Sequence, residues 1–560
     1  MKKSLFLYYT FFLLFASAIT HAQQIATGKH AMVVTEQRVA SQVGIDILRA
    51  GGNAVDAAVA VGYALAVVNP CCGNIGGGGF MLIHLANGKN TVINFREKAP
   101  LKAKQNMFLD KNGNLIPDAT TIGYLAVGVP GTVMGLNQAL QKYGTMTRKQ
   151  VMAPAIKLAK EGYRVTSFDA KWFSFYAPAF RKQANVAEIF LHDGKPWQAG
   201  DLFIQKDLGN TLSLIAEKGT EVFYKGNIAK KIVAASEKNG GILSMKDFAN
   251  YSVEEMPPIQ CSYHGYTIYS VPPPSSGGIA ICEMLSVLQH FNLRQSGFHT
   301  AASVHDIVES MRYAFNDRNT RLADPDFVHN PITQLLSPSY INSIVTKIRN
   351  TKTIPHAGKR LHEHEQTDTT HYSIMDKHGN AVSVTYTING FFGAKIIADH
   401  TGFFLNDTMD DFTAKPGTEN KFDLVQQAIN DVASHKRPLS SMSPTIVMKN
   451  NQPYMILGSP GGPRIITSVL LTLLNVIDYD FNILQAINLP RFHFQGSPDF
   501  IEIEPGAFTD VTTLQLKRMG YNIKQIHKWS AVEAILIDPQ SKILYGANDN
   551  RRPDGAAIGY

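Results

Sequence analysis

The first regular elements that the hydrophobic pattern predicts are two helices. Apolar residues recur at helical spacing over residues 36–49, and a pair of glycines at positions 51 and 52 ends that pattern. Asn53 is a capping residue, so a second helix is predicted from there through Val68. This second helix is apolar on nearly all sides, and we therefore expect it to be packed between other elements of a large protein.

Helical patterns also dominate the middle of the chain. They cover residues 132–143, 148–161, 227–239, 278–291 and 302–318. Residues 351–368 are instead polar and rich in histidine, without periodicity. A segment of this kind is typical of an exposed loop, where a chain can be cut without losing its core.

After residue 369 the pattern changes to strands. Residues 371–375 and 381–387 alternate around a turn at residues 376–380, which is typical of a β-hairpin. Further strands are predicted at residues 80–85, 91–95, 445–448, 454–457, 500–503, 532–537 and 543–545, and further helices near residues 464–477 and 512–519. Helices that cover strand-rich layers predict a layered α+β fold, and no internal repeat points to a solenoid.

The hairpin also predicts the neighbours of Thr369. If the turn is centred on residues 378–379, Thr369 lies opposite Ile388, to within one residue. Thr387 and Asn389 then fall beside Thr369. Thr387 could hydrogen-bond the Thr369 hydroxyl, and Asn389 could orient a new amine or a substrate.

Thr369 becomes a candidate nucleophile if the chain is cut after Asp368. The hydroxyl of a threonine within a chain is a poor nucleophile, and the residue has no base of its own. Cleavage gives the same residue a free α-amine, a useful fraction of which is neutral at physiological pH and can take the hydroxyl proton. The alternative for an isolated Thr-Thr pair is a threonine that simply opens a strand.

The N-terminus changes the expected location of the protein. Residues 1–3 are positively charged, residues 5–19 are apolar, and residues 20–22 offer a small-residue cleavage site. A bacterial-type secretory leader fits this pattern better than a membrane anchor, which needs a longer apolar span. We therefore expect a periplasmic or secreted protein with no membrane span after removal of the leader.

Charge and cysteine content exclude some classes of function. The net charge of +8 is scattered, without a basic run interleaved with aromatic residues, so nucleic acid is not an expected partner. Cys71 and Cys72 are adjacent and would form only a strained bridge, whereas Cys261 and Cys282 could pair. None of the four has the spacing of a zinc site, so we expect structural thiols or an incidental bridge.

Three glycine- or serine-rich segments have the composition of site loops. Residues 73–80 follow a helix and precede a strand, which is the wrong order for nucleotide binding and indicates close backbone packing. Residues 437–444 offer several hydroxyls before a strand. Residues 458–464 lead from a strand into a helix, and successive amides there can form an oxyanion hole. Ordinary turn chemistry explains either of the last two segments alone equally well.

Together these motifs resemble those of the gamma-glutamyltranspeptidases, of the bacterial exported type within the N-terminal-nucleophile hydrolases. They occur in the family's order over nearly the whole mature chain, and the joint match is specific although a single glycine loop is not. The motifs are GGNAVDAA (51–58), GNIGGGGF (73–80), FREKAP (95–100), PGT (130–132), PSSGG (274–278), TTHYS (369–373), MDDF (409–412), RPLSSMSP (437–444) and GSPGG (458–462).

The resemblance implies self-cleavage between Asp368 and Thr369. Residues 1–22 are then the signal peptide, residues 23–368 the large subunit and residues 369–560 the small subunit. The two subunits stay together as a heterodimer in one four-layer αββα sandwich, so the cut is not a domain boundary.

The resemblance also implies catalytic roles. Thr369 is the nucleophile, and Thr387 is the threonine that hydrogen-bonds it. Gly461 and Gly462 supply the oxyanion-hole amides. The implied activity is that of a gamma-glutamyltransferase and glutathione hydrolase. A Thr369 ester passes the γ-glutamyl group of glutathione or another γ-glutamyl compound to water, an amino acid or a peptide, without a metal or an organic cofactor.

Five further residues match substrate-binding positions of the family. Arg96 and Ser440, with Ser441 adjacent, match groups that bind the α-carboxylate. Asn389 and Asp411 match groups around the α-amine. A γ-glutamyl group carries both charges, so its site needs a planar cation for one and an anion for the other.

Three residues depart from the family pattern. Thr408 stands where relatives usually carry Gln or Glu, which removes a longer acceptor near the substrate amine. Phe422 stands where many bacterial relatives have a tyrosine in a loop that covers the pocket, and it lacks the hydroxyl that could fasten that loop. Asp368 replaces the Gln found in some relatives, which could alter the rate of maturation.

Two other functions remain alternatives. The first is a glutaryl-type β-lactam acylase or a poly-γ-glutamate-processing relative with the same fold. An acylase for a glutaryl group would not need the α-amine partners, whereas Asn389 and Asp411 are both present. The second is a non-enzymatic exported interaction protein, which predicts an uncleaved chain that has lost part of the site.

Overall fold

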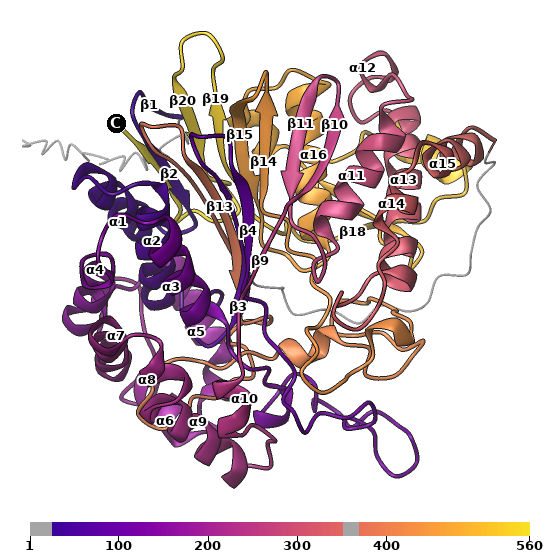
Figure 1. The fold of residues 1–560 in the computed structure, drawn as a ribbon. Helices are drawn as coiled ribbons and strands as arrows, with labels where there is room; N and C mark the ends of the chain where they lie inside the picture. Colours follow the sequence, from indigo (N-terminus) through magenta and orange to yellow (C-terminus); the bar gives the residue numbers. More distant parts are fainter. Residues whose placement is uncertain (1–24, 351–368) are drawn as a thin grey trace, which may run out of the picture.

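Two seven-stranded sheets packed face to face form the centre of the molecule, and helices cover the outer face of each (Figure 1). The computed structural model describes residues 25–350 and 369–560. The expected signal peptide, the loop at residues 351–368 and Asp368 lie outside the described residues. Within them the order helix, sheet, sheet, helix confirms the αββα sandwich.

The first sheet, called sheet I, contains the predicted hairpin at its centre. Its strands, in spatial order, are β21 (Ala556–Gly559), β2 (Met32–Thr35), β12 (Thr370–Met375), β13 (Ala381–Thr387), β3 (Gly78–His84), β4 (Asn90–Asn94) and β9 (Glu254–Met256). All neighbours in it are antiparallel. The two strands that follow Thr369 are therefore held between strands that precede it.

The second sheet, called sheet II, is also antiparallel and also mixes both parts of the chain. Its strands, in spatial order, are β1 (Ala26–Gly28), β20 (Leu544–Ala547), β19 (Glu533–Ile537), β15 (Gln452–Gly458), β14 (Thr445–Lys449), β11 (Tyr266–Ser270) and β10 (Ile259–Tyr263). The β10–β11 hairpin was not predicted, because its apolar residues are too few to stand out from the helices around it.

Apolar side chains alternate between the two faces of each strand. They form one apolar layer between the sheets and one between each sheet and its helices. Phe80 and Leu82 of β3 pack between the sheets against Ile446 and Ile456 of sheet II. Val382 and its equivalents on sheet I face outward into the helices instead. Every strand at the centre is thus covered on both sides, which explains why the hairpin strands are buried along their whole length.

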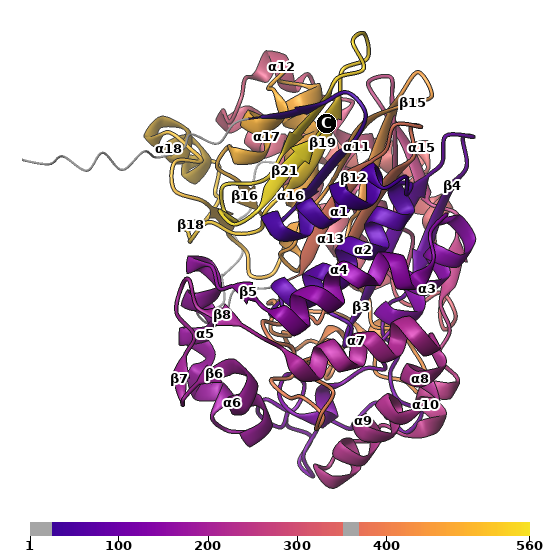
Figure 2. The ribbon, with the colours of Figure 1, turned by 90° about the vertical axis from the view of Figure 1, so that its left-hand side faces the viewer.

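Helices from the first half of the chain cover sheet I, and Figure 2 looks onto this layer. The helices of this half are α1 (Arg38–Arg49), α2 (Ala54–Val68), α3 (Thr132–Tyr143), α4 (Arg148–Glu161), α5 (Ser167–Phe180), α6 (Ala184–Phe190), α7 (Lys206–Lys218), α8 (Glu221–Tyr224), α9 (Asn227–Lys238) and α10 (Met245–Ala249). Of these, α1, α2 and α3 pack on strands of sheet I, α4 packs on α2, and α7 packs on α4. Helix α2 is the apolar helix predicted from the sequence: it packs on β12 and β13, and Asn53 caps it through a reciprocal bond with Asp56. All of its residues are buried, as expected.

Helices from both parts of the chain cover sheet II. They are α11 (Gly277–Leu288), α12 (Leu293–Ser296), α13 (Ala301–Arg321), α14 (Ile332–Leu335), α15 (Pro338–Asn350), α16 (Arg464–Ile477), α17 (Ile483–Asn488) and α18 (Asp510–Arg518). A small sheet of β16 (Phe492–His493), β17 (Ile501–Ile503) and β18 (Ile523–Gln525) lies beside them. Helix α16 contacts β15 of sheet II and follows the predicted glycine turn directly. No helix of the described residues combines the length and hydropathy that a bilayer span needs.

The four cysteines form two disulfides. One joins the neighbours Cys71 and Cys72, and the other joins Cys261 of β10 to Cys282 of α11. The second bridge confirms the pairing that the sequence left open. The first lies beside the site, because the Cys72 and Cys71 carbonyls accept from the N–H groups of Ile388 and Phe392.

Candidate active site

Thr369 and Thr387 lie side by side at one end of the central hairpin. Thr370 pairs with Tyr386, so Thr369 and Thr387 are the next opposed positions, one residue from the predicted register. The Thr369 hydroxyl donates to Thr387 Oγ1 over 3.2 Å. Both side chains are buried, and both line a small cavity between the ends of the two sheets.

The cavity brings together most of the residues that the sequence singled out. Its lining residues are Arg96, Arg318, Thr369, Thr387, Asn389, Asp411, Phe422, Leu424, Leu439, Ser440, Ser441, Met442, Gly462, Pro463 and Ile465. One end is marked by the threonine pair, and the other by charged side chains.

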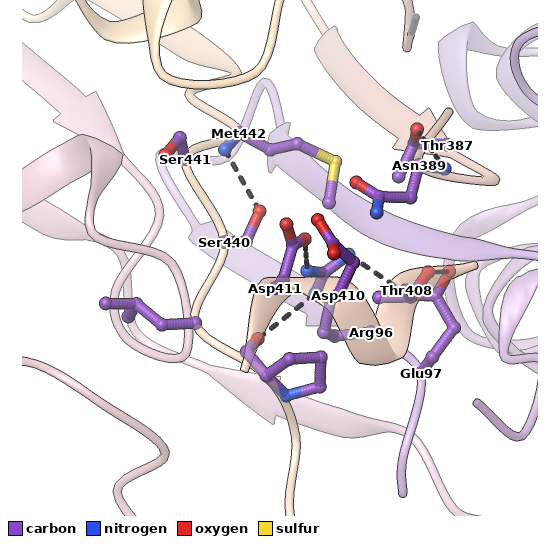
Figure 3. Close-up of polar contacts among 12 residues, drawn as sticks. Arg96, Glu97, Thr387, Asn389, Thr408, Asp410, Asp411, Ser440, Ser441 and Met442 are labelled. Atoms are coloured by element: carbon purple, nitrogen blue, oxygen red, sulfur yellow. Dashed lines mark hydrogen bonds and ion pairs between the residues drawn. The ribbon is translucent and has the colours of Figure 1, made fainter. Parts of the chain in front are cut away.

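Arg96 and Asp411 form an ion pair at the polar end (Figure 3). Arg96 Nη1 also donates to Glu97 Oε2 over 3.2 Å, and Arg96 Nε donates to the Pro438 carbonyl. The sequence assigned Arg96 and Asp411 to opposite charges of a substrate. In the structure they neutralise each other, and Glu97 is a second anion that the sequence analysis did not include.

The serine segment at residues 437–444 is held by the PSSGG motif. The Ser276 N–H and hydroxyl both donate to the Ser440 carbonyl, and the Ser440 N–H donates to Pro274 O over 2.7 Å. The Ser440 hydroxyl accepts from the Met442 N–H over 3.0 Å, as Figure 3 shows. This network fixes Ser440 and Ser441 in the cavity wall and gives the PSSGG motif a positioning role.

Asn389 follows the hairpin in a left-handed conformation, with φ of +77°. Its backbone N–H donates to Thr387 Oγ1 over 2.8 Å, and its side-chain nitrogen donates to the Asp407 carbonyl over 3.0 Å. The carboxamide oxygen is the acceptor that this arrangement leaves for a ligand. The structure thus places Asn389 beside Thr387 and Thr369, where the hairpin register predicted it.

Thr408 does not line the cavity. Its hydroxyl donates to Glu97 Oε1 over 2.8 Å, and its side chain is fully buried. The sequence analysis expected position 408 to affect the binding of the substrate amine directly. The structure instead connects Thr408 to the cavity through Glu97, which pairs with Arg96.

The glycine turn reaches the cavity through Gly462. Gly461 and Gly462 have φ of +128° and +56°, which favour glycine, and Arg464 begins α16 two residues later. Neither N–H of the pair has a hydrogen-bond partner among residues 25–350 and 369–560. Two free donors at a helix N-terminus can bind a developing oxyanion.

Burial shifts the pKa values of the carboxyl groups near Arg96. Burial raises the pKa of Asp410 to about 6, against the opposing effect of Lys421. It also raises the pKa of Asp411 and of Glu97, and Arg96 opposes both shifts. No cluster of three or more His, Cys, Asp or Glu side chains suited to a metal ion occurs in the described part of the chain.

Arg318 is the functional candidate that the sequence analysis missed. It is fully buried on α13, lines the cavity and donates to Ser441 Oγ over 3.2 Å. A signal was present: Arg318 falls at helical spacing from Met311, Ala314 and Phe315, on the buried face of an amphipathic helix. A charged residue on such a face needs a polar partner in the fold.

Comparisons with known proteins agree with these observations. The family model of gamma-glutamyltranspeptidase matches residues 40–559. A glutathione hydrolase proenzyme of Pseudomonas sp. (strain A14) is 48% identical over 551 residues, which cover 96% of each chain. That of Escherichia coli (strain K12) is 46% identical over 536 residues and covers 95% of this chain and 92% of its own.

Two solved structures extend the comparison to three dimensions. A cephalosporin acylase from Bacillus halodurans superposes with a TM-score of 0.85 at 27% identity, covering 98% of this chain and 99% of its own. The gamma-glutamyltranspeptidase of Helicobacter pylori superposes with a TM-score of 0.56 at 43% identity, covering 61% of this chain and 98% of its own. Sequence, fold and cavity agree, and the chain belongs to the gamma-glutamyltranspeptidase family of N-terminal-nucleophile enzymes.

Proposed function

We propose that the protein is a gamma-glutamyltransferase and glutathione hydrolase whose nucleophile is Thr369. The observation that carries this proposal is the cavity itself. It joins a threonine pair at one end to Arg96, Asp411 and the serine segment at the other. A γ-glutamyl group has a carbonyl at one end and both an α-carboxylate and an α-ammonium at the other.

Maturation comes first. Cleavage between Asp368 and Thr369 converts residues 23–368 and 369–560 into two subunits of a heterodimer and frees the Thr369 α-amine. The buried position of Thr369 beside Thr387 supports this step, because the fold already holds the hydroxyl in place. The leader at residues 1–22 supports export to the periplasm or beyond the cell.

Acylation then uses the free amine as a base. Thr369 Oγ1 attacks the γ-carbonyl carbon, and its proton passes to the amine. The Gly461 and Gly462 N–H groups bind the oxyanion of the tetrahedral intermediate. When that intermediate collapses, the carbon–nitrogen bond breaks, the ammonium returns the proton to the leaving nitrogen, and a Thr369 ester remains.

Deacylation repeats these steps with a new nucleophile. Water gives glutamate, whereas the amine of an amino acid or a dipeptide gives a new γ-glutamyl amide. Throughout, Arg96 with Ser440 and Ser441 holds the α-carboxylate, and Asp411 with Asn389 holds the α-ammonium. No step calls for a metal or an organic cofactor.

Replacing the nucleophile tests this proposal. Thr369→Ala should remain one chain and lose turnover of γ-glutamyl-p-nitroanilide on the order of a millionfold, since both reactions need the hydroxyl. Thr369→Ser keeps a hydroxyl and should still be cleaved, which N-terminal sequencing of the small subunit detects. An active, cleaved Thr369→Ala protein contradicts the mechanism.

A second candidate function is hydrolysis of glutaryl amides. The structural similarity to a cephalosporin acylase favours it, and so does a 34% identical acylase proenzyme of Pseudomonas sp. (strain V22). The presence of Asp411 and Asn389 favours the γ-glutamyl substrate instead. The ratio of kcat/KM for γ-glutamyl-p-nitroanilide and glutaryl-p-nitroanilide decides between them, because these compounds differ only in the α-amine.

A further inference from the structure

The disulfide between Cys71 and Cys72 lies against the turn that carries Asn389. We call the segment from Ile388 to Phe392 the Asn389 turn. The Ile388 N–H donates to the Cys72 carbonyl over 2.9 Å, and the Phe392 N–H donates to the Cys71 carbonyl over 2.8 Å. Both ends of the turn are thus fastened to two neighbouring residues, and the disulfide joins those two residues to each other.

The backbone of the Asn389 turn needs fastening of this kind. Asn389 and Phe392 have φ of +77° and +58°, a region that is unfavourable for a residue with a side chain. Such a conformation persists only where the surrounding structure holds it. A third contact holds the middle of the turn, because the Gly390 N–H donates to Asp407 Oδ1 over 2.8 Å. The orientation of Asn389 therefore depends on contacts that reach across the fold.

The disulfide fixes the carbonyl that the end of the turn uses. A bond between the sulfurs of adjacent residues closes a small ring, and this ring contains the peptide group that carries the Cys71 carbonyl. Rotation of that peptide group is then restricted. If the ring is open, the Cys71 carbonyl can rotate away from the Phe392 N–H. Both residues are buried, so bulk water does not replace the lost hydrogen bond.

Asn389 connects the ring to the cavity. It lines the cavity beside Thr387 (Figure 3), and its N–H donates to Thr387 Oγ1 over 2.8 Å. A displaced turn moves the carboxamide of Asn389 relative to a bound α-ammonium. Thr369 is held separately, because it continues a strand of the central hairpin and donates to Thr387. Loosening the turn should therefore weaken binding more than it slows the chemical step.

We propose that the Cys71–Cys72 disulfide is a positioning element of the substrate site, which holds the Asn389 turn and thereby sets the affinity for the α-ammonium of a γ-glutamyl group. This inference rests on the proposed function of the cavity. It gives no such role to the second disulfide, which joins Cys261 of β10 to Cys282 of α11.

A single substitution opens the ring. In Cys71→Ser the new hydroxyl can donate to Asn69 Oδ1, which lies 3.3 Å from Cys71 Sγ. KM for γ-glutamyl-p-nitroanilide should rise about threefold to tenfold, as expected for the loss of about one hydrogen bond between neutral groups. The value of kcat should stay within about twofold, because the nucleophile keeps its place. Cys261→Ser is the matched control: it opens the other disulfide and should leave both constants within about twofold.

A double-mutant cycle separates this role from a general structural one. Asn389→Gly removes the carboxamide and tolerates the left-handed backbone. If the disulfide acts through Asn389, Cys71→Ser should lower kcat/KM about threefold to tenfold in the parent and less than about twofold in Asn389→Gly. Equal losses in the two proteins show that the disulfide acts elsewhere, and they overturn the inference.

Hydrogen exchange measures the fastening without a substrate. We suggest the uncleaved Thr369→Ala chain, with and without Cys71→Ser, so that a variant that does not mature is still tested. The amides of the Asn389 turn should exchange about tenfold faster in the chain with Cys71→Ser, and those of the β12–β13 hairpin at an unchanged rate. Unchanged exchange in the turn overturns the inference, and so does faster exchange throughout the hairpin.

These measurements distinguish the inference from the proposed function. If the matured parent releases no p-nitroaniline but Cys71→Ser speeds exchange in the turn alone, the proposed function fails and the fastening of the turn stands. If the parent is active and exchange in the turn is unchanged, only the inference fails. Free thiols at Cys71 and Cys72 in the denatured, unreduced parent also overturn the inference, because no ring then exists.

Discussion

At the scale of single residues, an unusual carboxyl group contacts the strand that follows Thr369. Glu36 is 2% exposed, accepts from the His371 N–H over 3.2 Å and lies 3.3 Å from Arg552. Burial raises its pKa from 4.5 to about 7. The buried carboxyl group of Glu533 is close by, and burial together with Glu36 raises its pKa well above the usual range. Both carboxyl groups therefore favour the protonated form at neutral pH more than an exposed glutamate does.

This group predicts a pH dependence of stability. Below about pH 4.5 Glu36 is protonated in both states, so its contribution is fully present, and it is lost as the pH rises through the folded pKa of about 7. The shift corresponds to roughly 3 kcal/mol. Urea unfolding of the uncleaved Thr369→Ala chain should show this loss, and the same chain with Glu36→Gln should lose less stability over the same range, because Asp169 and Asp410 still contribute. Parallel curves for the two chains between pH 4.5 and 8 contradict the prediction.

The sequence predicted which residues lie together at the site better than it predicted which of their charged side chains form ion pairs. The hairpin register located Thr387 and Asn389 beside Thr369, because strand pairing is a local rule. The Arg96–Asp411 pair joins residues from distant parts of the chain, and the choice of ion-pair partner depends on the whole fold. Arg318 was missed for the same reason: its helix was predicted, but the cavity against which that helix packs was not.

At the scale of elements, residues 413–436 contribute to the cavity wall, and we call them the covering segment. Phe422 and Leu424 of this segment line the cavity, and the Phe422 ring lies against Gly462. Phenylalanine lacks the hydroxyl expected to fasten such a loop. The segment is instead fastened by Lys421, whose Nζ pairs with Asp407 over 2.7 Å, and by Gln495, which donates to the Phe422 carbonyl.

Removing the lysine should loosen the covering segment. Lys421→Met leaves the buried Asp407 carboxylate without its cation, so the segment is held less firmly against the cavity. A loss of about 1 kcal/mol of binding free energy corresponds to about a fivefold rise in KM for γ-glutamyl-p-nitroanilide. Limited proteolysis should cut the segment faster than in the parent. Lys415→Met is the matched control, because Lys415 lies in the same segment and donates to the Gly113 carbonyl rather than to Asp407. Equal cutting rates in both variants would exclude this role for Lys421.

The elements themselves were predicted best where a long apolar pattern has clear start and stop residues, as in α2. Residues 132–143, 148–161 and 464–477 form helices with the predicted bounds. Short strands such as β2 and β21 were missed, because three or four residues carry little periodicity and their strand conformation depends on pairing with each other. The longer helices α5, α7 and α15 were also missed. In α15 the signal was present, because its buried residues Ile341, Ile344, Val345 and Ile348 recur at helical spacing.

At the scale of the whole molecule, the two sides of the cut are interleaved rather than adjacent. In sheet I, β12 pairs with β2 and β13 pairs with β3. In sheet II, β1 pairs with β20 and β11 pairs with β14. Each sheet therefore crosses from one prospective subunit to the other more than once. Both disulfides, in contrast, lie on the large-subunit side of the cut.

This arrangement predicts that the subunits stay together without covalent links. The cleaved protein should elute as one species in reductant, because ladder hydrogen bonds and the apolar layer between the sheets hold it together. In urea, dissociation and loss of secondary structure should coincide, since neither subunit contains a complete sheet. The unfolding midpoint of the cleaved protein should rise with protein concentration, whereas that of the uncleaved Thr369→Ala chain should not, as mass action requires. Separation of folded subunits at a urea concentration below the unfolding transition would show that the interleaved strands do not hold the two pieces together.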